Sequence, residues 1–179
     1  MKLSFLVVLW FWIINPQHGD THAKWEGTQE ESSIKFNIRN LGINVEGVFD
    51  SFTTEVDYNK NQPSSSRFSA KILVNSINTG INKRDNHLKQ EEFFHVEKYP
   101  TITFQSTEVS SPGSNQLKVK GDLTIKGKTL PIELDVTISE SGGKTAFTIS
   151  GELDRRDFGV GGSSWVMSDD VYLDLYVEN

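Results

Sequence analysis

Apolar and polar residues alternate along most of the chain. A period of two residues is typical of a β-strand that buries one face and exposes the other. Phe36 and Ile38, for example, alternate with Lys35 and Asn37. The alternation shifts register near Asp50–Ser51, where we expect a bulge or bend. After a short first strand at 25–28, the segments with this pattern are residues 34–38, 45–58, 68–74, 102–109, 117–125, 130–138, 145–153 and 171–177.

Turns rich in glycine and polar residues join these segments. Tight turns are expected at 126–128 and 142–143, and longer polar loops at 59–66, 110–116 and 155–164. About eight antiparallel strands with one apolar face close naturally into a barrel, which leaves no exposed sheet edge. The pattern therefore predicts an all-β barrel, either filled by its own side chains or holding one elongated ligand.

One stretch departs from the strand pattern. We expect a short helix near 83–91, capped by Asn82 or Asp85, with Leu88 facing inward. Pro100 prevents the helix from continuing, because proline cannot donate a backbone hydrogen bond.

Two aromatic side chains, Phe93 and Phe94, follow this helix. They either form a lid over the barrel or cap an ordinary core. Arg84-Asp85 and the 155–157 cluster of two arginines and an aspartate lie near aromatic residues. Each cluster either fixes a loop through ion pairs or anchors a polar headgroup at the mouth of the barrel.

The first 23 residues are expected to be a secretory signal peptide. A lysine precedes an apolar run at residues 5–14, which is too short to span a bilayer. Residues 21–23 place small side chains at the positions that signal peptidase requires for a cut after Ala23. We therefore expect a periplasmic or secreted protein with one domain over residues 24–179.

Composition and charge exclude several partners and chemistries. The net charge of −6 and the pI of about 5.2 argue against nucleic acid as a partner. The chain has no cysteine, which excludes disulfides, thiol catalysis and lipid attachment through cysteine.

Sequence motifs for catalysis or metal binding are also missing. The glycines at 159–162 do not fit a phosphate-binding loop, and Ser163 and Ser164 lack the flanking pattern of a nucleophilic serine. His87 and His95 have no third ligand at metal spacing. We expect no enzyme activity, no cofactor and no metal site.

Several motifs, in order along the chain from about Trp25 to the C-terminus, resemble the YceI-like family. They are Phe36-Asn37-Ile38-Arg39-Asn40-Leu41-Gly42 with Val45, Gly47 and Phe49; Ser76-Ile77-Asn78-Thr79-Gly80; Arg84-Asp85 with His87, Leu88 and Phe93-Phe94; Tyr99-Pro100 with Ile102 and Phe104; Gly121 with Leu123-Thr124-Ile125-Lys126-Gly127; and Arg156-Asp157-Phe158-Gly159-Val160-Gly161 with Ser168-Asp169 and Val171.

The resemblance implies an extended lipocalin-like antiparallel β-barrel. It also implies an exported bacterial protein whose apolar tunnel holds a polyisoprenoid, an isoprenoid quinone, a fatty-acid derivative or another long-chain amphiphile. The turn Lys126-Gly127-Lys128-Thr129 departs from the Gly-Val-Thr that relatives often carry, but it is a surface turn. The alternatives are an enzyme or accessory factor acting on a lipid, and a ligand-free structural or stress-response barrel. A homodimer and a transient contact with a membrane or partner enzyme stay open.

The expected ligand-binding residues are the inward positions of the strands, the aromatic residues beside them and the polar residues at the mouth. The set is Phe36, Ile38, Phe49, Phe68, Ala70, Ile72, Arg84, Asp85, His87, Leu88, Phe93, Phe94, Phe104, Leu123, Leu134, Phe158, Trp165 and Leu175. Within it, Arg84, Asp85 or His87 would orient a headgroup, and Phe93, Phe94, Phe158 and Trp165 would close the ends of the tunnel.

Overall fold

The structure, a computed structural model, describes residues 22–27 and 32–178. Its strands form one antiparallel sheet in the order β1-β4-β5-β7-β8-β9-β10-β11-β2-β3-β6. The strands are β1 (His22–Gly27), β2 (Ser33–Asn40), β3 (Ile43–Phe49), β4 (Phe52–Asn59), β5 (Arg67–Leu73), β6 (Ile77–Asn78), β7 (Thr101–Gly113), β8 (Gln116–Ile125), β9 (Lys128–Ser141), β10 (Lys144–Asp154) and β11 (Met167–Glu178). The helices are α1 (Asn82–Leu88) and the 3₁₀ turns η1 (Pro63–Ser65) and η2 (Val74–Ser76).

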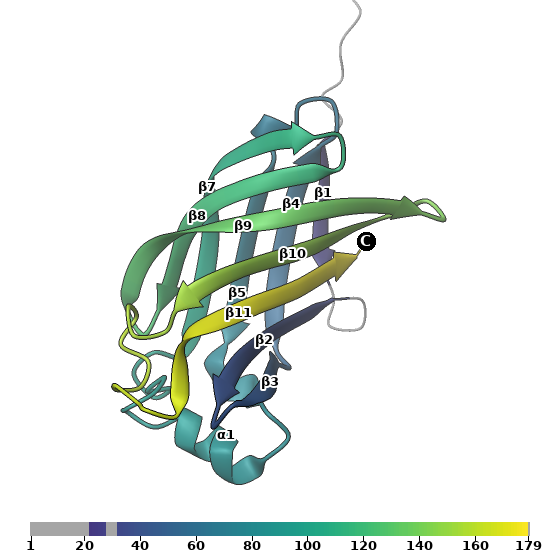
Figure 1. Ribbon diagram of the computed structural model, residues 1–179. Helices are drawn as coiled ribbons and strands as arrows, with labels where there is room; N and C mark the ends of the chain where they lie inside the picture. Colours follow the sequence, from purple (N-terminus) through teal and green to yellow (C-terminus); the bar gives the residue numbers. More distant parts are fainter. Residues whose placement is uncertain (1–21, 28–31, 179) are drawn as a thin grey trace, which may run out of the picture.

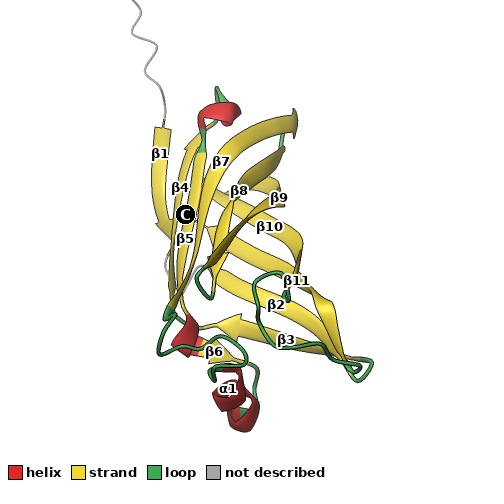
Figure 2. Ribbon diagram, turned by 90° about the vertical axis from the view of Figure 1, so that its left-hand side faces the viewer, coloured by secondary structure: helices red, strands yellow, loops and turns green. Residues whose placement is uncertain are grey.

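The sheet curls around its apolar face into a half-barrel, and α1 lies at one end (Figure 1, Figure 2). At that end the two sides of the sheet are joined through the bend between β3 and β4. The amide of Asp50 donates to the carbonyl of Ser76 over 3.1 Å, and the amide of Leu73 donates to the carbonyl of Ser51 over 2.9 Å. The all-β antiparallel barrel with one short α-helix is confirmed, and the expected bend at Asp50–Ser51 separates β3 from β4.

The strand count and three local predictions differ from the structure. Within the described residues the sheet has eleven strands and not about eight, because β6 is a short addition and the bend splits one long segment into β3 and β4; the short first strand predicted at 25–28 is β1, at His22–Gly27. The loop predicted at 110–116 is strand up to Gly113, since register shifts in the β7–β8 ladder accommodate Pro112. Helix α1 ends at Leu88, and neither Asn82 nor Asp85 caps it, because the residue before the helix is Ile81.

The predicted signal peptide lies outside the described residues except for its last two, His22 and Ala23. These two begin β1, which pairs with β4. Within the described residues, no helix is both long and apolar enough to cross a membrane.

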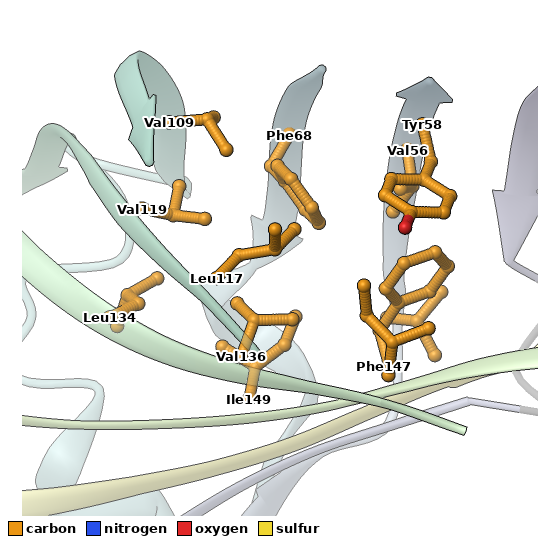
Figure 3. Close-up of a cluster of buried hydrophobic side chains, with 12 residues drawn as sticks. Val56, Tyr58, Phe68, Val109, Leu117, Val119, Leu134, Val136, Phe147 and Ile149 are labelled. Atoms are coloured by element: carbon orange, nitrogen blue, oxygen red, sulfur yellow. The ribbon is translucent and has the colours of Figure 1, made fainter. Parts of the chain in front are cut away.

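The half of the barrel away from α1 is filled by its own side chains. The ring of Phe147 packs edge-on against Tyr58 and Phe68, with centroids 5.5 and 5.9 Å apart. Leu117 and Val119 are 2% and 0% exposed in the same cluster (Figure 3). A barrel end packed this densely has no room for a guest molecule.

Two phenylalanine rings pack directly against glycines of neighbouring strands. A Cβ atom at Gly47 would stand 2.2 Å from the ring of Phe36, and one at Gly121 would stand 2.5 Å from the ring of Phe104. Both contacts are far shorter than any carbon pair tolerates, so only glycine fits beneath these rings. The missing side chains of Gly47 and Gly121 leave space next to the sheet, and the two rings occupy it.

Candidate functional site

The inner face of the half-barrel encloses one long apolar cavity of about 200 Å³. Its wall is formed by strands from both sides of the sheet, by α1 and by the loops beneath. The lining residues are Ile34, Lys35, Phe36, Ile38, Asn40, Val45, Phe49, Thr54, Val56, Phe68, Ser69, Ala70, Ile72, Thr79, Arg84, Leu88, Phe93, Phe94, Ile102, Phe104, Val119, Leu123, Ile125, Ile132, Leu134, Val136, Ile149, Leu153, Arg155, Val160, Met167, Val171, Leu173, Leu175 and Val177.

The cavity is closed at one end and open at the other. At the closed end it is lined by Val56, Val119 and Val177, which belong to the filled cluster around Phe147 and are 2% exposed or less. Towards α1 the lining residues become half-buried, as at Met167 and Leu88. We call this half-buried end the open end; it lies between α1 on one side and the β2–β3 turn with the start of β11 on the other.

Aromatic rings cover the side of the cavity next to α1. Phe49 packs against Phe36 and Phe94, with ring centroids 5.6 and 6.2 Å apart. The amide of Phe94 donates to the carbonyl of Leu88 over 3.0 Å, which holds the turn after α1 against the helix. Phe94 therefore forms part of a cover whose position is set by the backbone of α1.

Arg84, in α1, contributes a cationic side chain to the cavity wall. Its Nε donates to the hydroxyl of Thr79 over 2.7 Å, and its Nη2 donates to the carbonyl of Thr79 over 2.6 Å. Asp85 turns back to accept hydrogen bonds from the amide and hydroxyl of the same threonine. The Nη1 group of Arg84 has no protein acceptor among the described residues, and Arg84 is one of the residues that line the cavity.

Arg155 also lines the cavity, but most of the N–H groups of its guanidinium already have partners. It is 4% exposed, and it donates to the carbonyls of Ser168, Val160 and Gly162 at 2.8–3.1 Å. Its Nη2 pairs with Asp169 at 2.8 Å. These bonds use four of the five N–H groups of the guanidinium and fix the loop at 155–164 below the barrel, so the main role of Arg155 is structural.

Tyr58 and Lys60, two groups with raised pKa values, lie at the end of β4 away from the open end of the cavity. Burial raises the pKa of Tyr58, which stands in the filled half. A hydrogen bond to Glu140 raises the pKa of exposed Lys60. Among residues 22–27 and 32–178, no three His, Asp or Glu side chains gather closely enough to hold a metal.

Fourteen of the eighteen expected site residues line the cavity. Asp85, His87, Phe158 and Trp165 do not. Asp85 is buried against Thr79, and His87 is exposed and pairs with Glu92. Phe158 is 3% exposed, packed in the core beneath the cavity, and Trp165 is wholly exposed. Neither of these two aromatic residues closes an end of the tunnel.

Several wall residues were absent from the expected set. Most continue the alternation of strands already recognised, so the same period could have found them. The polar residues Lys35, Asn40, Ser69 and Thr79 have no such signal, because pattern alone assigns polar side chains to the outer face. The apolar strand residues that line the cavity but were not in the predicted set are Ile34, Val45, Val56, Ile102, Val119, Ile125, Ile132, Val136, Ile149, Leu153, Met167, Val171, Leu173 and Val177.

A curled antiparallel sheet around an apolar cavity, with one helix at its open end, defines the class of small lipocalin-like barrels. Residues 25–179 match the model of the YceI-like domain, and the chain belongs to that family. It is 33% identical over 157 residues to a UPF0312 protein of Vibrio cholerae, which covers 82% of this chain and 80% of the relative.

Two solved structures share the fold. BcnA of Burkholderia cenocepacia superposes with a TM-score of 0.82 at 24% identity, over 86% of this chain and 99% of that protein. A polyisoprenoid binding domain of Saccharophagus degradans superposes with a TM-score of 0.66 at 14% identity, over 88% of this chain and 97% of that domain.

Proposed function

We propose that this protein is an exported, non-catalytic binding protein that holds the chain of a long amphiphile in its cavity. One observation carries the proposal: the cavity is long, closed at one end and lined mostly by apolar side chains. Each buried methylene contributes about 0.8 kcal/mol, less the cost of ordering the chain. Dispersed contacts along the wall therefore suffice for tight binding.

The size of the cavity sets the kind of ligand. A cavity of about 200 Å³ with an almost wholly apolar wall suits an alkyl or isoprenoid chain. The solved polyisoprenoid binding domain with the same fold supports this ligand class.

The polar end of the amphiphile would lie at the open end, where Arg84 lines the cavity. Its Nη1 is available, while Thr79 already holds the other side of the guanidinium in place. A headgroup oxygen would receive a hydrogen bond there. Asp85 is committed to Thr79, and no described residues beside the cavity combine a nucleophile with a base and an orienting group.

Blocking the cavity tests the proposal. Ala70 lines the cavity wall on β5, and Lys71, the next residue, is exposed on the outer face. Ala70→Trp fills the space of the ligand and should abolish recovery of lipid from the purified protein, measured by native mass spectrometry and organic extraction. Lys71→Trp adds the same ring outside and should leave lipid recovery unchanged.

Two outcomes would contradict the proposal that the protein carries a lipid. Unchanged lipid binding in a folded Ala70→Trp variant would mean that the ligand lies elsewhere. A wild-type protein without lipid, destabilised by Ala70→Trp by roughly 1–3 kcal/mol, would favour the ligand-free barrel, because overpacking costs that much. The mass of the exported protein tests export separately, since a cut after Ala23 would leave Lys24 as the first residue of β1.

A further inference from the structure

Two adjacent turns at the open end of the cavity expose apolar side chains. Leu41 and Ile43, in the β2–β3 turn, are 71% and 67% exposed. Trp165 and Val166, just before β11, are 104% and 49% exposed. The amide of Leu41 donates to the carbonyl of Val166 over 2.7 Å, so the two turns are bound together. We call these four side chains the rim patch.

The rim patch is continuous with the cavity. Asn40 and Met167, the residues next to the patch on each turn, pair across β2 and β11, and both line the cavity. Figure 1 places the β2–β3 turn and the start of β11 at the same end of the barrel as α1. A molecule entering or leaving the open end therefore passes beside the rim patch.

The two turns are also free of charge. Neither 40–44 nor 161–167 contains a charged residue, although 23% of the chain is charged. A protein of net charge −6 is repelled by an anionic surface, so the turns suit contact driven by apolar burial and not by electrostatic attraction. Tryptophan with exposed aliphatic neighbours is typical of side chains at a membrane interface.

The size and shape of the patch argue against a second protein as its occupant. A stable protein–protein interface takes roughly 20 to 30 residues a side. The rim patch has four apolar side chains at the tips of two turns, whereas a bilayer accepts such tips without a complementary surface. We propose that the rim patch inserts into the interfacial layer of a lipid bilayer, with the open end of the cavity facing the membrane.

Insertion of the rim patch into a bilayer goes beyond the proposed function and does not depend on it. Its use for loading an amphiphile directly from the bilayer rests on the proposed function. Vesicle binding tests the docking, and recovery of lipid from the purified protein tests the carrier, so failure of one is distinguishable from failure of the other.

The experiment measures the fluorescence emission of Trp165. The chain contains four tryptophans, of which Trp10 and Trp12 lie in the proposed signal peptide, so Trp25→Phe in the protein that begins at Lys24 leaves Trp165 as the sole fluorophore. On adding phosphatidylcholine vesicles, its emission should shift to shorter wavelength and be quenched by lipids brominated along the acyl chain. Vesicle binding should persist in 0.5 M NaCl, because salt screens only charge–charge attraction.

Variants of the patch complete the test. Leu41→Ser with Ile43→Ser, in the same single-tryptophan chain, should weaken vesicle binding at least tenfold. Tyr172→Ser removes another exposed apolar side chain, 53% exposed on β11, and should leave binding unchanged. Trp165 emission insensitive to vesicles, or equal binding by the patch variant, would overturn the proposal. So would self-association in lipid-free buffer that the patch variant abolishes, because the occupant would then be a second copy.

Discussion

Phe147 packs behind Phe68 at the closed end of the cavity, and shortening it should make the cavity longer. The ring closes the filled end by packing against Phe68, which lines the cavity, and Tyr58. Phe147→Ala removes six ring carbons and opens space for roughly six carbons of a ligand chain. The cost in the ligand-free protein is about 3–5 kcal/mol, as for other large-to-small changes at fully buried aromatic residues.

A longer ligand should recover part of that loss. A ligand at 100 times its dissociation constant stabilises the folded state by about 2.7 kcal/mol. Urea unfolding with and without lipid measures the recovery, and native mass spectrometry of the extracted lipids measures chain length. The Phe147→Ala protein should select longer chains than the wild type.

Val109→Ala provides the control for this prediction. Val109 is buried in the same cluster, but it is a smaller side chain without the ring contact that Phe147 makes to cavity-lining Phe68. Its truncation should cost about 2 kcal/mol without changing the chain length that is bound. Equal chain length in the wild type and Phe147→Ala would refute the assignment of Phe147 as the end of the cavity.

Three further predictions follow from other contacts. Gly47→Ala should push the ring of Phe36 into the cavity, weakening lipid binding and costing about 1–3 kcal/mol by urea unfolding. Arg155→Met should cost about 3 kcal/mol and increase proteolysis of the loop at 155–164, because buried carbonyls lose their donor. The hydrogen bond from Lys144 lowers the pKa of Glu178, so its contribution to stability is present above pH 4.5, the ordinary pKa, and is lost as pH falls through the lower folded-state value. Glu178→Gln should flatten that part of the acid unfolding curve.

The strand part of the cavity wall was predictable because a strand has fixed parity. Once Phe68 is assigned inward, Ala70 and Ile72 must share its face, and all three line the cavity. The same rule links Phe36 with Ile38. Antiparallel pairing of long amphipathic strands then leaves few arrangements other than a curled sheet.

The loop residues were not predictable, because a loop has no such parity. Phe158 and Val160 lie two residues apart in the 155–164 loop, yet Val160 lines the cavity and Phe158 packs beneath it. Trp165 is exposed although its size favours burial. Asp85 was read as a cap or headgroup contact, but its carboxylate is held by Thr79, six residues earlier. Such contacts depend on how the chain returns on itself.

The order of the strands also bears on when the barrel can form during synthesis. β2 lies between β3 and β11, so Ile38 pairs with Val171, across most of the length of the chain. Pairings this distant in sequence slow folding, because a long loop must be ordered before the contact forms. β11 is the last of these strands along the chain, so the outer side of β2 has no partner strand until β11 has been made. If the protein is exported as we propose, this delay gives the chain more time to cross the membrane before it folds.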